Sequence, residues 1–479
     1  MERQQLPQVR ISGFAGLSRA ALCLLVAVVA GGPAGALAQA SMQTLRTNGP
    51  AANRFNLVLL SEGYTSAQLT RFPADATNAV NALLAHQPYR EYSNYFNAFA
   101  IKVASNQSGS DHPAYGLYAD TYFNSTYDPI SDRLITIPPN FADADYNSGQ
   151  GRVDVLLQAF MPKCNLSVLL VNEPYTEGGS DGDGATAIAA TSYSLPEILT
   201  HETGHVVANL GDEYDYPYPG FPDTEEPNTT RQTNRTLVKW NVWIDRSTPV
   251  PTAPADSYPA TIGLFEGAHY HSVGWYRPKL NCLMRESYAP FCEVCSESLV
   301  LAVYRHVRPV DAFSPASTNL SISTTQALAF QLTLLQPATH NLSVQWYTNK
   351  TTVVGATNPV FTLAPPLLGN GNHLVSAAVR DNTLLVRNDP TNLLSQTVAW
   401  EVNVNLPHLQ MDSPLWLTGG QFAFRIVGSA PQGVVIQGST NLLHWTEIAT
   451  NSLVGGELWH TNPSAGSTPW GFYRAVAPR

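Results

Sequence analysis

The chain reads His201-Glu202-Thr203-Gly204-His205 and continues, after three residues, with Asn209-Leu210-Gly211-Asp212-Glu213-Tyr214. On an α-helix, positions i and i+4 share one face with Cβ atoms about 5–6 Å apart, so both histidines can reach one cation. A catalytic zinc site takes three protein ligands and leaves one position for water. Glu202 lies on a different face and can reach that water as a general base. The stretch therefore predicts a helix with His201 and His205 as zinc ligands and Glu202 as the catalytic residue.

Sequence signals mark both ends of this helix. Ser194-Leu195-Pro196-Glu197 matches a capping box, with Ser194 as the N-cap and Glu197 as the third helical residue. Asn209 is one of the few non-glycine residues that tolerate the left-handed conformation in which many helices end. We therefore expect the helix to begin after Ser194 and to end near Asn209, where the chain turns back.

The acidic pair after the helix offers the third ligand. A left-handed residue at 209 directs the side chain of Asp212, three residues later, under the histidines. Two neutral imidazoles and one carboxylate leave zinc a net positive charge and hence an effective Lewis acid. Acidic side chains are unfavourable at a helix C-terminus, and a cation compensates them. We predict that Asp212 is the third zinc ligand, with Glu213 as the rival candidate.

Further motifs follow one another in a fixed order over residues 54–300. They are residues 56–65, residues 92–99, Val171-Asn172-Glu173 with the pair Gly178-Gly179, residues 201–214, Glu226-Pro227-Asn228-Thr229, Lys239-Trp240 and residues 267–295. In this order of motifs the chain resembles the IgA-peptidase-type family of secreted bacterial zinc metallopeptidases. Two positions depart from the family pattern. Asn209 stands where a glycine is expected, and Ser61-Glu62-Gly63 replaces the usual Gly-Asp-Gly.

The resemblance implies a metzincin-like zinc peptidase domain over residues 39–308, with Zn²⁺ as cofactor and a protein or peptide as substrate. Peptidases of the metzincin type place a methionine turn beneath the zinc. Met284 is one of only five methionines and lies close to cysteines that can brace such a turn. A lone methionine usually fills a core, so its role here is implied by the order of the motifs.

The residues themselves indicate an α/β pattern in the first part of the chain. Apolar runs at 55–60, 99–103 and 168–171 predict strands, and amphipathic segments at 66–85, interrupted at Pro73, and 153–160 predict helices. The acidic loop that contains Asp181 and Asp183 lacks a bidentate carboxylate at the distance that a calcium loop needs. We interpret it as a plain loop, with a calcium site as the alternative.

Near residue 309 the pattern changes to short strands separated by turns. Alternating apolar residues around Trp346 and Trp400 predict an immunoglobulin-like β-sandwich over 309–405, without the usual disulfide. Residues 406–479 repeat the alternation and predict a small β-rich C-terminal module. Its aromatic residues can bind carbohydrate, but we expect most of them to fill the core.

Charge and the N-terminal segment bound the location of the protein. The 479-residue chain has a formal net charge of −10, which argues against non-specific binding to nucleic acid or to an anionic membrane. Residues 1–38 combine Arg3, Arg10 and Arg19 with an apolar run from Ala20 to Ala30 and a small-residue cleavage site, Ala36-Leu37-Ala38. This segment predicts a signal peptide. We therefore expect a secreted or periplasmic protein without a membrane span and leave its oligomeric state open.

Four cysteines remain after that cleavage: Cys164, Cys282, Cys292 and Cys295. Disulfides are the default in exported proteins, so we predict two, with Cys282 paired to Cys292 or Cys295 and Cys164 to the other. A structural zinc site that uses Cys292 and Cys295 with the remaining pair is the competing hypothesis.

Two classes of function follow from these patterns. The first is a secreted zinc-dependent endopeptidase that hydrolyses peptide bonds with a zinc-bound water activated by Glu202. The second is a non-catalytic exported adhesion or carbohydrate-binding protein that uses its β modules. The intact set of His201, Glu202, His205 and Asp212 favours the first, since a decayed enzyme usually loses one of them.

Overall fold

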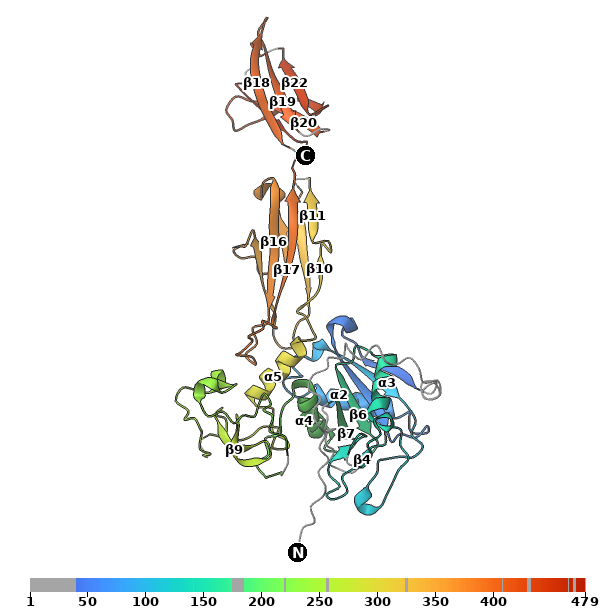
Figure 1. Ribbon diagram of the computed structural model, residues 1–479. Coiled ribbons are helices and arrows are strands. Elements are labelled where there is room, and N and C mark those ends of the chain that lie inside the picture. Colours follow the sequence, from blue (N-terminus) through green and yellow to red (C-terminus); the bar gives the residue numbers. More distant parts are fainter. Residues whose placement is uncertain are drawn as a thin grey trace. The chain divides into compact units, whose positions relative to one another are not determined.

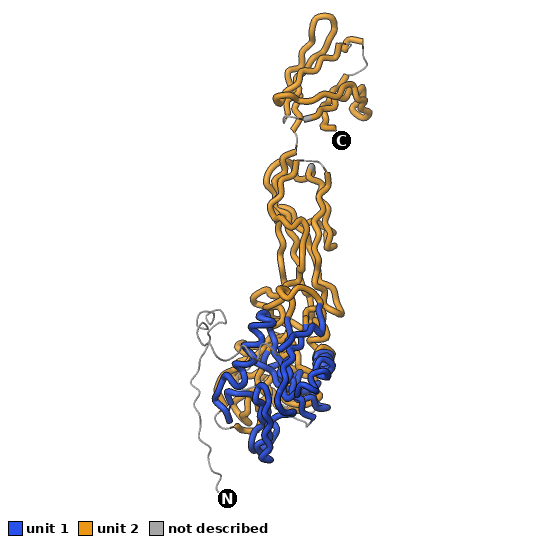
Figure 2. The backbone as a smooth tube through the Cα atoms, turned by 90° about the vertical axis from the view of Figure 1, so that its right-hand side faces the viewer, with its two compact units in different colours: residues 1–47, 56–82, 98–206 blue, residues 48–55, 83–97, 207–479 orange. Residues whose placement is uncertain are grey.

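The computed structural model describes residues 40–478 except 141, 175–184, 219–220, 256–257, 324–325, 407, 429–431, 464 and 468–470. The described elements are mostly β-strands in several sheets, with few helices (Figure 1). Two compact units divide the chain: residues up to 47, 56–82 and 98–206, and residues 48–55, 83–97 and 207–479 (Figure 2). The predicted signal peptide and the loop with Asp181 and Asp183 lie outside the described residues.

The first unit is built largely on a five-stranded sheet of order β1-β3-β2-β6-β7. Its strands are β1 (Ser41–Arg46), β3 (Phe96–Lys102), β2 (Phe55–Glu62), β6 (Leu166–Val171) and β7 (Thr186–Ala190). Strands β2, β6 and β7 run parallel, whereas β1 is antiparallel to β3. Every residue of β2 and β6 is buried, which explains why each strand contains an uninterrupted apolar run, residues 57–60 in β2 and 168–171 in β6.

Helices pack on both faces of this sheet. Helix α3 (Gln150–Phe160) contributes Val153 and Leu156 to a core that also contains Val58 of β2 and Leu169 of β6. In Figure 1, α3 lies on one side of the sheet, and α2 (Phe72–Leu83) and α4 (Leu195–Ala208) lie on the other. The first unit therefore combines a sheet that contains three parallel strands with helices on its two faces (Figure 1).

Helix α2 differs from its prediction. The sequence predicts a helix over 66–85 with an interruption at Pro73, but the helix begins at Phe72 and the residues before it form turns. Proline has no backbone N–H, and the first turn of a helix does not need that donor. Pro73 therefore marks the start of the helix, not a break within it.

The peptidase-motif region of the second unit is rich in loops. Its hairpin pairs β8 (Phe265–Ala268) with β9 (His271–Arg277), and helix α5 (Glu293–Tyr304) follows. Among the described residues between 214 and 264, the regular elements are two short 3₁₀ helices, η5 (Arg235–Leu237) and η6 (Asn241–Trp243). The described residues of this stretch are therefore mostly irregular.

Residues 310–404 form two sheets. One has the order β10-β12-β15 and the other β11-β17-β16-β13-β14. The strands are β10 (Val310–Ser314), β11 (Asn319–Ile322), β12 (Leu328–Leu334), β13 (Ser343–Thr348), β14 (Thr351–Thr352), β15 (Val360–Leu363), β16 (Gly371–Arg380) and β17 (Ser395–Val404). Trp346 and Trp400 are buried and stack with ring centroids 5.8 Å apart in a core shared with Phe330.

A buried polar cluster in the second unit connects residues 91 and 92 to this β-rich part. The imidazole of His340 bonds to the Glu91 carboxylate through Nδ1 and to Oδ1 of Asp381 through Nε2, the latter at 2.6 Å. The other oxygen of Asp381 accepts hydrogen bonds from the hydroxyls of Tyr92 (2.9 Å) and Tyr304 (2.6 Å). The carboxylate of Asp381, which is 1 % exposed, is therefore saturated with donors.

Residues 409–476 form two three-stranded sheets, β18-β19-β22 and β21-β20-β23. Their strands are β18 (Leu409–Leu417), β19 (Gln421–Gly428), β20 (Gln432–Ser439), β21 (Thr446–Leu453), β22 (Glu457–Asn462) and β23 (Phe472–Val476). Phe424, Ile426 and Ile436 fill the core. No helix in the described part of the chain is long and apolar enough to cross a membrane.

Candidate metal centre

Helix α4 carries the histidine motif and has the predicted ends. It begins at Leu195, directly after Ser194, and its last residue is Ala208. Asn209 follows with φ 52°, in the left-handed region. The asparagine therefore fills the role that a glycine more often has at a helix end.

The helix places the two imidazoles beside one another. The Nε2 atoms of His201 and His205 are 3.1 Å apart. One ligand atom each of His201, His205 and Asp212 can be chosen so that all three lie within 4.8 Å of one another. Bonds of roughly 2.0–2.1 Å in a tetrahedral zinc site separate two ligand atoms by about 3.3 Å. The donor set and its spacing therefore fit a zinc ion.

Glu202 differs from its neighbours in exposure. Its side chain is 5 % exposed, whereas both histidines are partly exposed. The helix thus keeps the carboxylate of Glu202 out of bulk water and leaves an open side at the imidazoles. A carboxylate in such surroundings can accept a proton from a water molecule held next to it.

Asp212 is held from the hairpin β8–β9. The Tyr270 hydroxyl donates a hydrogen bond of 2.6 Å to Oδ2 of Asp212, and the His269 N–H donates to the Asp212 carbonyl at 3.0 Å. His269 and Tyr270 both have positive φ, 55° and 56°. Non-glycine residues reach this conformation at a cost and keep it where the surroundings impose it. The unfavourable backbone conformation of the turn between β8 and β9 therefore accompanies the hydrogen bond from Tyr270 to Asp212.

The surroundings of Tyr270 keep its hydroxyl protonated. Its ring packs on Tyr214, Tyr216 and Phe221, with centroids 4.6–5.6 Å away. Burial, followed by the negative charge of Asp212, raises the pKa of Tyr270 far above its ordinary value. Tyr270 therefore acts as a hydrogen-bond donor to Asp212 at all physiological pH values.

Asn228 fixes the backbone just before Asp212. Its Oδ1 accepts from the Gly211 N–H at 2.7 Å, and its Nδ2 donates to the Gly211 carbonyl at 2.8 Å and to Oε1 of Glu213 at 2.9 Å. A Cβ atom on Gly211 would lie 2.5 Å from Oε2 of Glu226. A side chain at 211 would therefore displace the carboxylate of Glu226, and the two bonds to Gly211 need an amide at 228.

The structure separates the two rival ligands. Asp212 lies with the histidines, whereas Glu213 is 0 % exposed and groups with Cys282, Cys292 and Cys295. The Glu213 N–H donates to the carbonyl of Met284 at 2.9 Å, and Met284 is itself fully buried. The methionine segment is therefore bonded to the residue that directly follows Asp212.

His269, in the turn between β8 and β9, pairs with Glu226. His269 is 0 % exposed, its Nδ1 lies 3.0 Å from Oε2 of Glu226, and its ring stacks on Trp275 at 3.9 Å. Burial lowers the pKa of His269, but hydrogen bonds to Glu226 and to the Pro222 carbonyl outweigh it, so the pKa is raised overall. Glu226 belongs to the motif 226–229, whose function the sequence alone did not reveal.

The structure contradicts the prediction of two disulfides. None of the four cysteines forms one. Cys164 is buried in the hydrophobic core of the first unit, among residues such as Val153 and Leu169. Cys282, Cys292 and Cys295 group around Glu213 instead. Export favours disulfides only where geometry brings the sulfurs together in pairs, and an odd group of three does not meet that condition.

The comparison with protein families agrees with this geometry. The sequence model of a family described as IgA Peptidase M64 matches residues 43–256 and 253–303, more than half of the chain. The chain belongs to the IgA Peptidase M64 family. The match includes helix α4, Asp212, Asn228, Tyr270 and Cys282 to Cys295. No curated protein matches the chain significantly.

Two solved structures show only slight similarity to this M64 chain. One is the apo structure of Bacteroides uniformis β-glucuronidase 3, at 8% identity, with 42% of this chain and 27% of that chain covered and a TM-score of 0.14. The other is the amphioxus IgVJ-C2 molecule, at 11% identity, with 33% and 98% covered and a TM-score of 0.13. The chain thus spans about a quarter of the length of the first.

The family whose model matches the chain is described as a peptidase family. A pocket of about 470 Å³ lies beside Asn209 at the end of α4. Residues of two family motifs line it, Glu226 and Pro227 from one and Lys239 and Trp240 from the other. The motifs that the sequence grouped by resemblance therefore gather in space next to the end of the histidine helix.

Proposed function

We propose that this M64 protein is a zinc-dependent endopeptidase. The observation that carries the proposal is the 3.1 Å separation of the His201 and His205 Nε2 atoms, with a carboxylate oxygen of Asp212 in the same group. Two imidazoles and one carboxylate hold a catalytic zinc ion and leave a coordination position open. When bound, zinc polarises the scissile carbonyl and makes the attacking water more acidic.

The protein's own residues divide the remaining work. Glu202 takes the proton from the attacking water and later passes it to the leaving amine. Tyr270 holds Asp212 through the 2.6 Å hydrogen bond, and Asn228 holds the backbone that leads to it. Such supporting hydrogen bonds orient ligands and tune their basicity. The segment 211–214 is thus held from two sides.

The Glu202→Gln variant tests the proposal. The amide has nearly the same shape as the carboxylate but cannot take a proton from water, so we expect zinc content and folding to stay as in the wild type. Peptide cleavage should fall about a hundredfold or more. The assay uses a mixed-peptide library with mass-spectrometric readout, together with metal analysis of the same preparations. Wild-type cleavage by the variant would remove Glu202 from the mechanism.

A matched control uses the other carboxylate of the same helix. Glu197 lies in the first turn of α4 and is not part of either group of possible metal ligands in the described residues. Glu197→Gln should leave cleavage within about twofold of the wild type, since surface changes away from such features have small effects. Chelation of zinc should abolish cleavage by the wild type, and added zinc should restore it.

The finer architecture and the location are part of the proposal. We assign residues 39–308 to a metzincin-like peptidase domain, 309–405 to an immunoglobulin-like β-sandwich and 406–479 to a C-terminal module. The parallel strands β2, β6 and β7 with α4 support the first assignment, and the packed tryptophans 346 and 400 support the second. The N-terminal segment 1–38 supports cleavage of a signal peptide and a secreted or periplasmic location.

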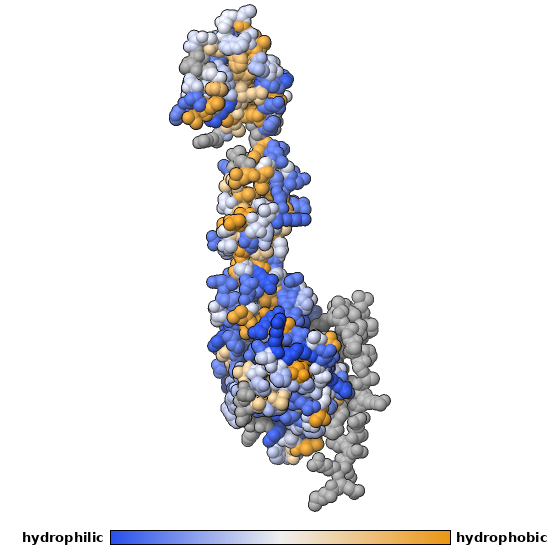
Figure 3. Space-filling view, turned by 90° about the vertical axis from the view of Figure 1, so that its left-hand side faces the viewer, coloured by the Kyte–Doolittle hydropathy of each residue, from blue (hydrophilic) through white to orange (hydrophobic). Residues whose placement is uncertain are grey.

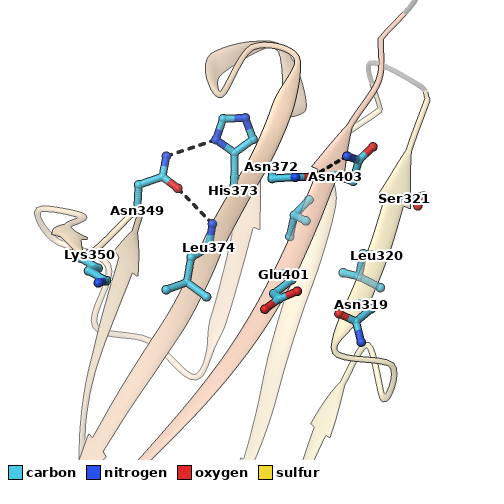
Figure 4. Close-up of a pocket in the computed structure, with 11 residues that line it drawn as sticks. Asn319, Leu320, Ser321, Asn349, Lys350, Asn372, His373, Leu374, Glu401 and Asn403 are labelled. Carbon is cyan, nitrogen blue, oxygen red and sulfur yellow. Dashed lines mark hydrogen bonds between the residues drawn. The ribbon is translucent and has the colours of Figure 1, made fainter.

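The binding-protein alternative has weaker support. A pocket on the sheet of β11, β17, β16 and β13 is lined by polar side chains that bond to one another, Asn349 to His373 and Asn403 to Asn372 (Figure 4). No Trp, Tyr or Phe is among the described residues that line it. Carbohydrate sites usually stack sugars on aromatic rings, so this pocket does not favour one.

Aromatic residues of the C-terminal module are more exposed than expected. Trp416 is 63% and Trp459 52% exposed, and hydrophobic side chains occur among hydrophilic ones on the surface in Figure 3. Trp416 pairs with Phe422, and Trp459 pairs with Arg425. Phe422 and Arg425 are three positions apart on β19, so the two tryptophans lie on opposite faces of the sheet. They do not form one stacking platform.

A further inference from the structure

Three cysteines and one glutamate of the second unit surround a common point. One ligand atom from each of Glu213, Cys282, Cys292 and Cys295 lies within 4.8 Å of every other. The four side chains are 0–1 % exposed. We propose that they bind a second zinc ion, in a closed structural site of three thiolates and one carboxylate. The proposal does not rest on the catalytic role proposed for the histidine helix.

Two backbone features place the thiols. Cys282 lies in a turn after β9, where its carbonyl accepts hydrogen bonds from the Arg285 N–H (2.9 Å) and the Glu286 N–H (2.8 Å). Cys292 directly precedes α5, and Cys295 lies in the first turn of that helix. The Cys-x-x-Cys spacing at a helix start brings both sulfurs to the positive end of the helix dipole, which stabilises thiolates.

The distances match those of a tetrahedral zinc site. Zinc–sulfur bonds of about 2.3 Å place two sulfurs about 3.8 Å apart, and the Sγ atoms of Cys282 and Cys295 are 3.7 Å apart. A zinc–oxygen bond of about 2.1 Å places sulfur and oxygen about 3.6 Å apart, and Sγ of Cys295 lies 3.7 Å from Oε1 of Glu213. The Cys292 N–H donates to Sγ of Cys282 at 3.3 Å, as backbone donors do to metal-bound thiolates.

The state of Glu213 points to a cation in this group. Its Oε1 accepts from Asn228, but its Oε2 is buried and has no hydrogen-bond partner among the described residues. Burial of a polar atom without a partner is costly, and burial of a charge without compensation costs far more. The guanidinium of Arg277 interacts with Glu213 electrostatically, but one positive charge does not balance a carboxylate and several thiolates. A divalent cation adds two positive charges, so that the cation and Arg277 together offset three of the four negative charges of three thiolates and one carboxylate.

A disulfide or simple apolar packing of the thiols fits this group less well than a metal ion. A disulfide needs sulfurs 2.03–2.05 Å apart, whereas Cys282 and Cys295 are 3.7 Å apart. A disulfide between any two of the three cysteines would also leave the third thiol beside a buried carboxylate. Buried cysteines often act as small apolar residues, but three apolar residues would not be packed around the carboxylate of Glu213.

The proposed site stabilises the chain segment that carries Asp212. Glu213 directly follows Asp212, and Met284 lies two residues after Cys282. The hydrogen bond from the Glu213 N–H to the Met284 carbonyl connects these two segments. The second zinc ion therefore links three segments: the residue after Asp212, the turn after β9 and the start of α5. Its four protein ligands leave no coordination position for water.

The His201→Ala/His205→Ala variant isolates the second site. The full chain is expressed with its N-terminal segment and purified after export. Metal analysis should then give about two zinc ions per molecule for the wild type and about one for the variant. X-ray absorption at the zinc edge of the variant should show about three sulfur neighbours near 2.3 Å. A variant without metal, one that holds iron, or a Cys282–Cys295 disulfide in a non-reducing peptide map would overturn the proposal.

Glu213→Gln, in the same double-histidine background, is a milder change than replacement of a cysteine. The amide keeps the shape of the side chain and its bond to Asn228 but is a poor zinc ligand. We expect zinc affinity, measured by competition with a chromogenic chelator, to fall at least about tenfold while circular dichroism is unchanged. Unchanged affinity would remove Glu213 from the site. Cys295→Ser serves as a second variant, and its purification with a full zinc ion would likewise contradict the proposal.

The outcomes for the two metal groups are distinguishable. If the double-histidine variant holds one sulfur-bound zinc ion and the wild type cleaves no peptide, the proposed function fails and the second site stands. If the wild type is an active peptidase with a single zinc ion and the double variant is free of metal, the second site fails and the proposed function stands.

Discussion

The side chain of Asn228 bonds to both backbone polar groups of Gly211, accepting from the N–H at 2.7 Å and donating to the carbonyl at 2.8 Å. The two residues are 17 positions apart and both are buried. This pairing replaces the regular hydrogen bonds that the chain gives up when α4 ends. It thereby fixes the path of the backbone one residue before Asp212.

Asn228→Ala tests this clamp. The substitution leaves the N–H and the carbonyl of Gly211 buried without partners, which costs about 1–3 kcal/mol each. We expect a lower free energy of unfolding and a zinc affinity about 10–100-fold weaker, as for other residues that support metal ligands. The partly exposed Asn241 provides the control. Asn241→Ala should change stability by no more than about 0.5 kcal/mol, and equal effects of the two substitutions would argue against a specific clamp.

Tyr270→Phe removes the hydroxyl that bonds to Asp212 and keeps the ring in its aromatic surroundings. We expect the protein to fold and to bind zinc about 10–100-fold more weakly. The activity at saturating zinc and the pH profile of kcat/KM separate loss of metal from altered chemistry. Tyr218→Phe is the control, because Tyr218 is 61 % exposed and belongs to the same aromatic group. Wild-type zinc affinity in Tyr270→Phe would remove the hydroxyl from the support of Asp212.

Asp212→Ala should abolish binding of the catalytic zinc ion. A missing ligand costs more affinity than a missing supporting residue, for which about 10–100-fold is typical. Metal analysis should therefore show a loss of about one ion relative to the wild type and no peptide cleavage. Asp215→Ala, on the same loop and partly exposed, should keep the full metal content. Full metal content in Asp212→Ala would overturn the ligand assignment.

His340 should make the stability of the second unit depend on pH. Burial lowers its pKa, but the bonds to Asp381 and Glu91 outweigh that effect, so the pKa is raised overall. A raised pKa contributes stability that is fully present below the unfolded value of about 6.5 and is lost as pH rises through the folded value. His340→Gln should therefore destabilise the protein most at the acidic end of a series from about pH 5.5 to 9 and least at the alkaline end.

The measurement is the free energy of unfolding of wild type and variant across that series. Asn382→Ala is a non-titrating control next to Asp381, with its amide bonded to the Ser343 hydroxyl at 2.9 Å. Its effect should be independent of pH. A His340→Gln effect that grows with rising pH would have the wrong sign and would contradict a raised pKa.

Local signals were sufficient to predict the histidine helix. Ser194 and Asn209 act on residues within one or two turns, so the ends of α4 follow from the sequence. The same is true of the buried strands β2 and β6, whose apolar runs are continuous. The predicted interruption at Pro73 was wrong, because a proline can either break a helix or stand in its first turn. Only the packing of the whole helix decides between the two.

Contacts between distant residues were beyond the reach of such signals. Tyr270 meets Asp212 across 58 positions and Asn228 meets Gly211 across 17, and no local rule of spacing relates either pair. The cysteines show the same limit, because the even number of four suggested pairs, whereas three of them share Glu213. The oxidising surroundings of an exported protein allow thiols to form disulfides, but the fold decides which sulfur atoms come into contact.

The amide proton of Glu213, given to the Met284 carbonyl at 2.9 Å, has a use in measurement. A buried and bonded amide exchanges with deuterium only when the surrounding structure opens, at a rate set by the free energy of that opening. This proton lies on the segment between Asp212 and the cysteine group, so its exchange reports on that segment alone. The deuterium uptake of one peptide that spans residue 213 can therefore measure how readily this segment opens, without any assay of catalysis.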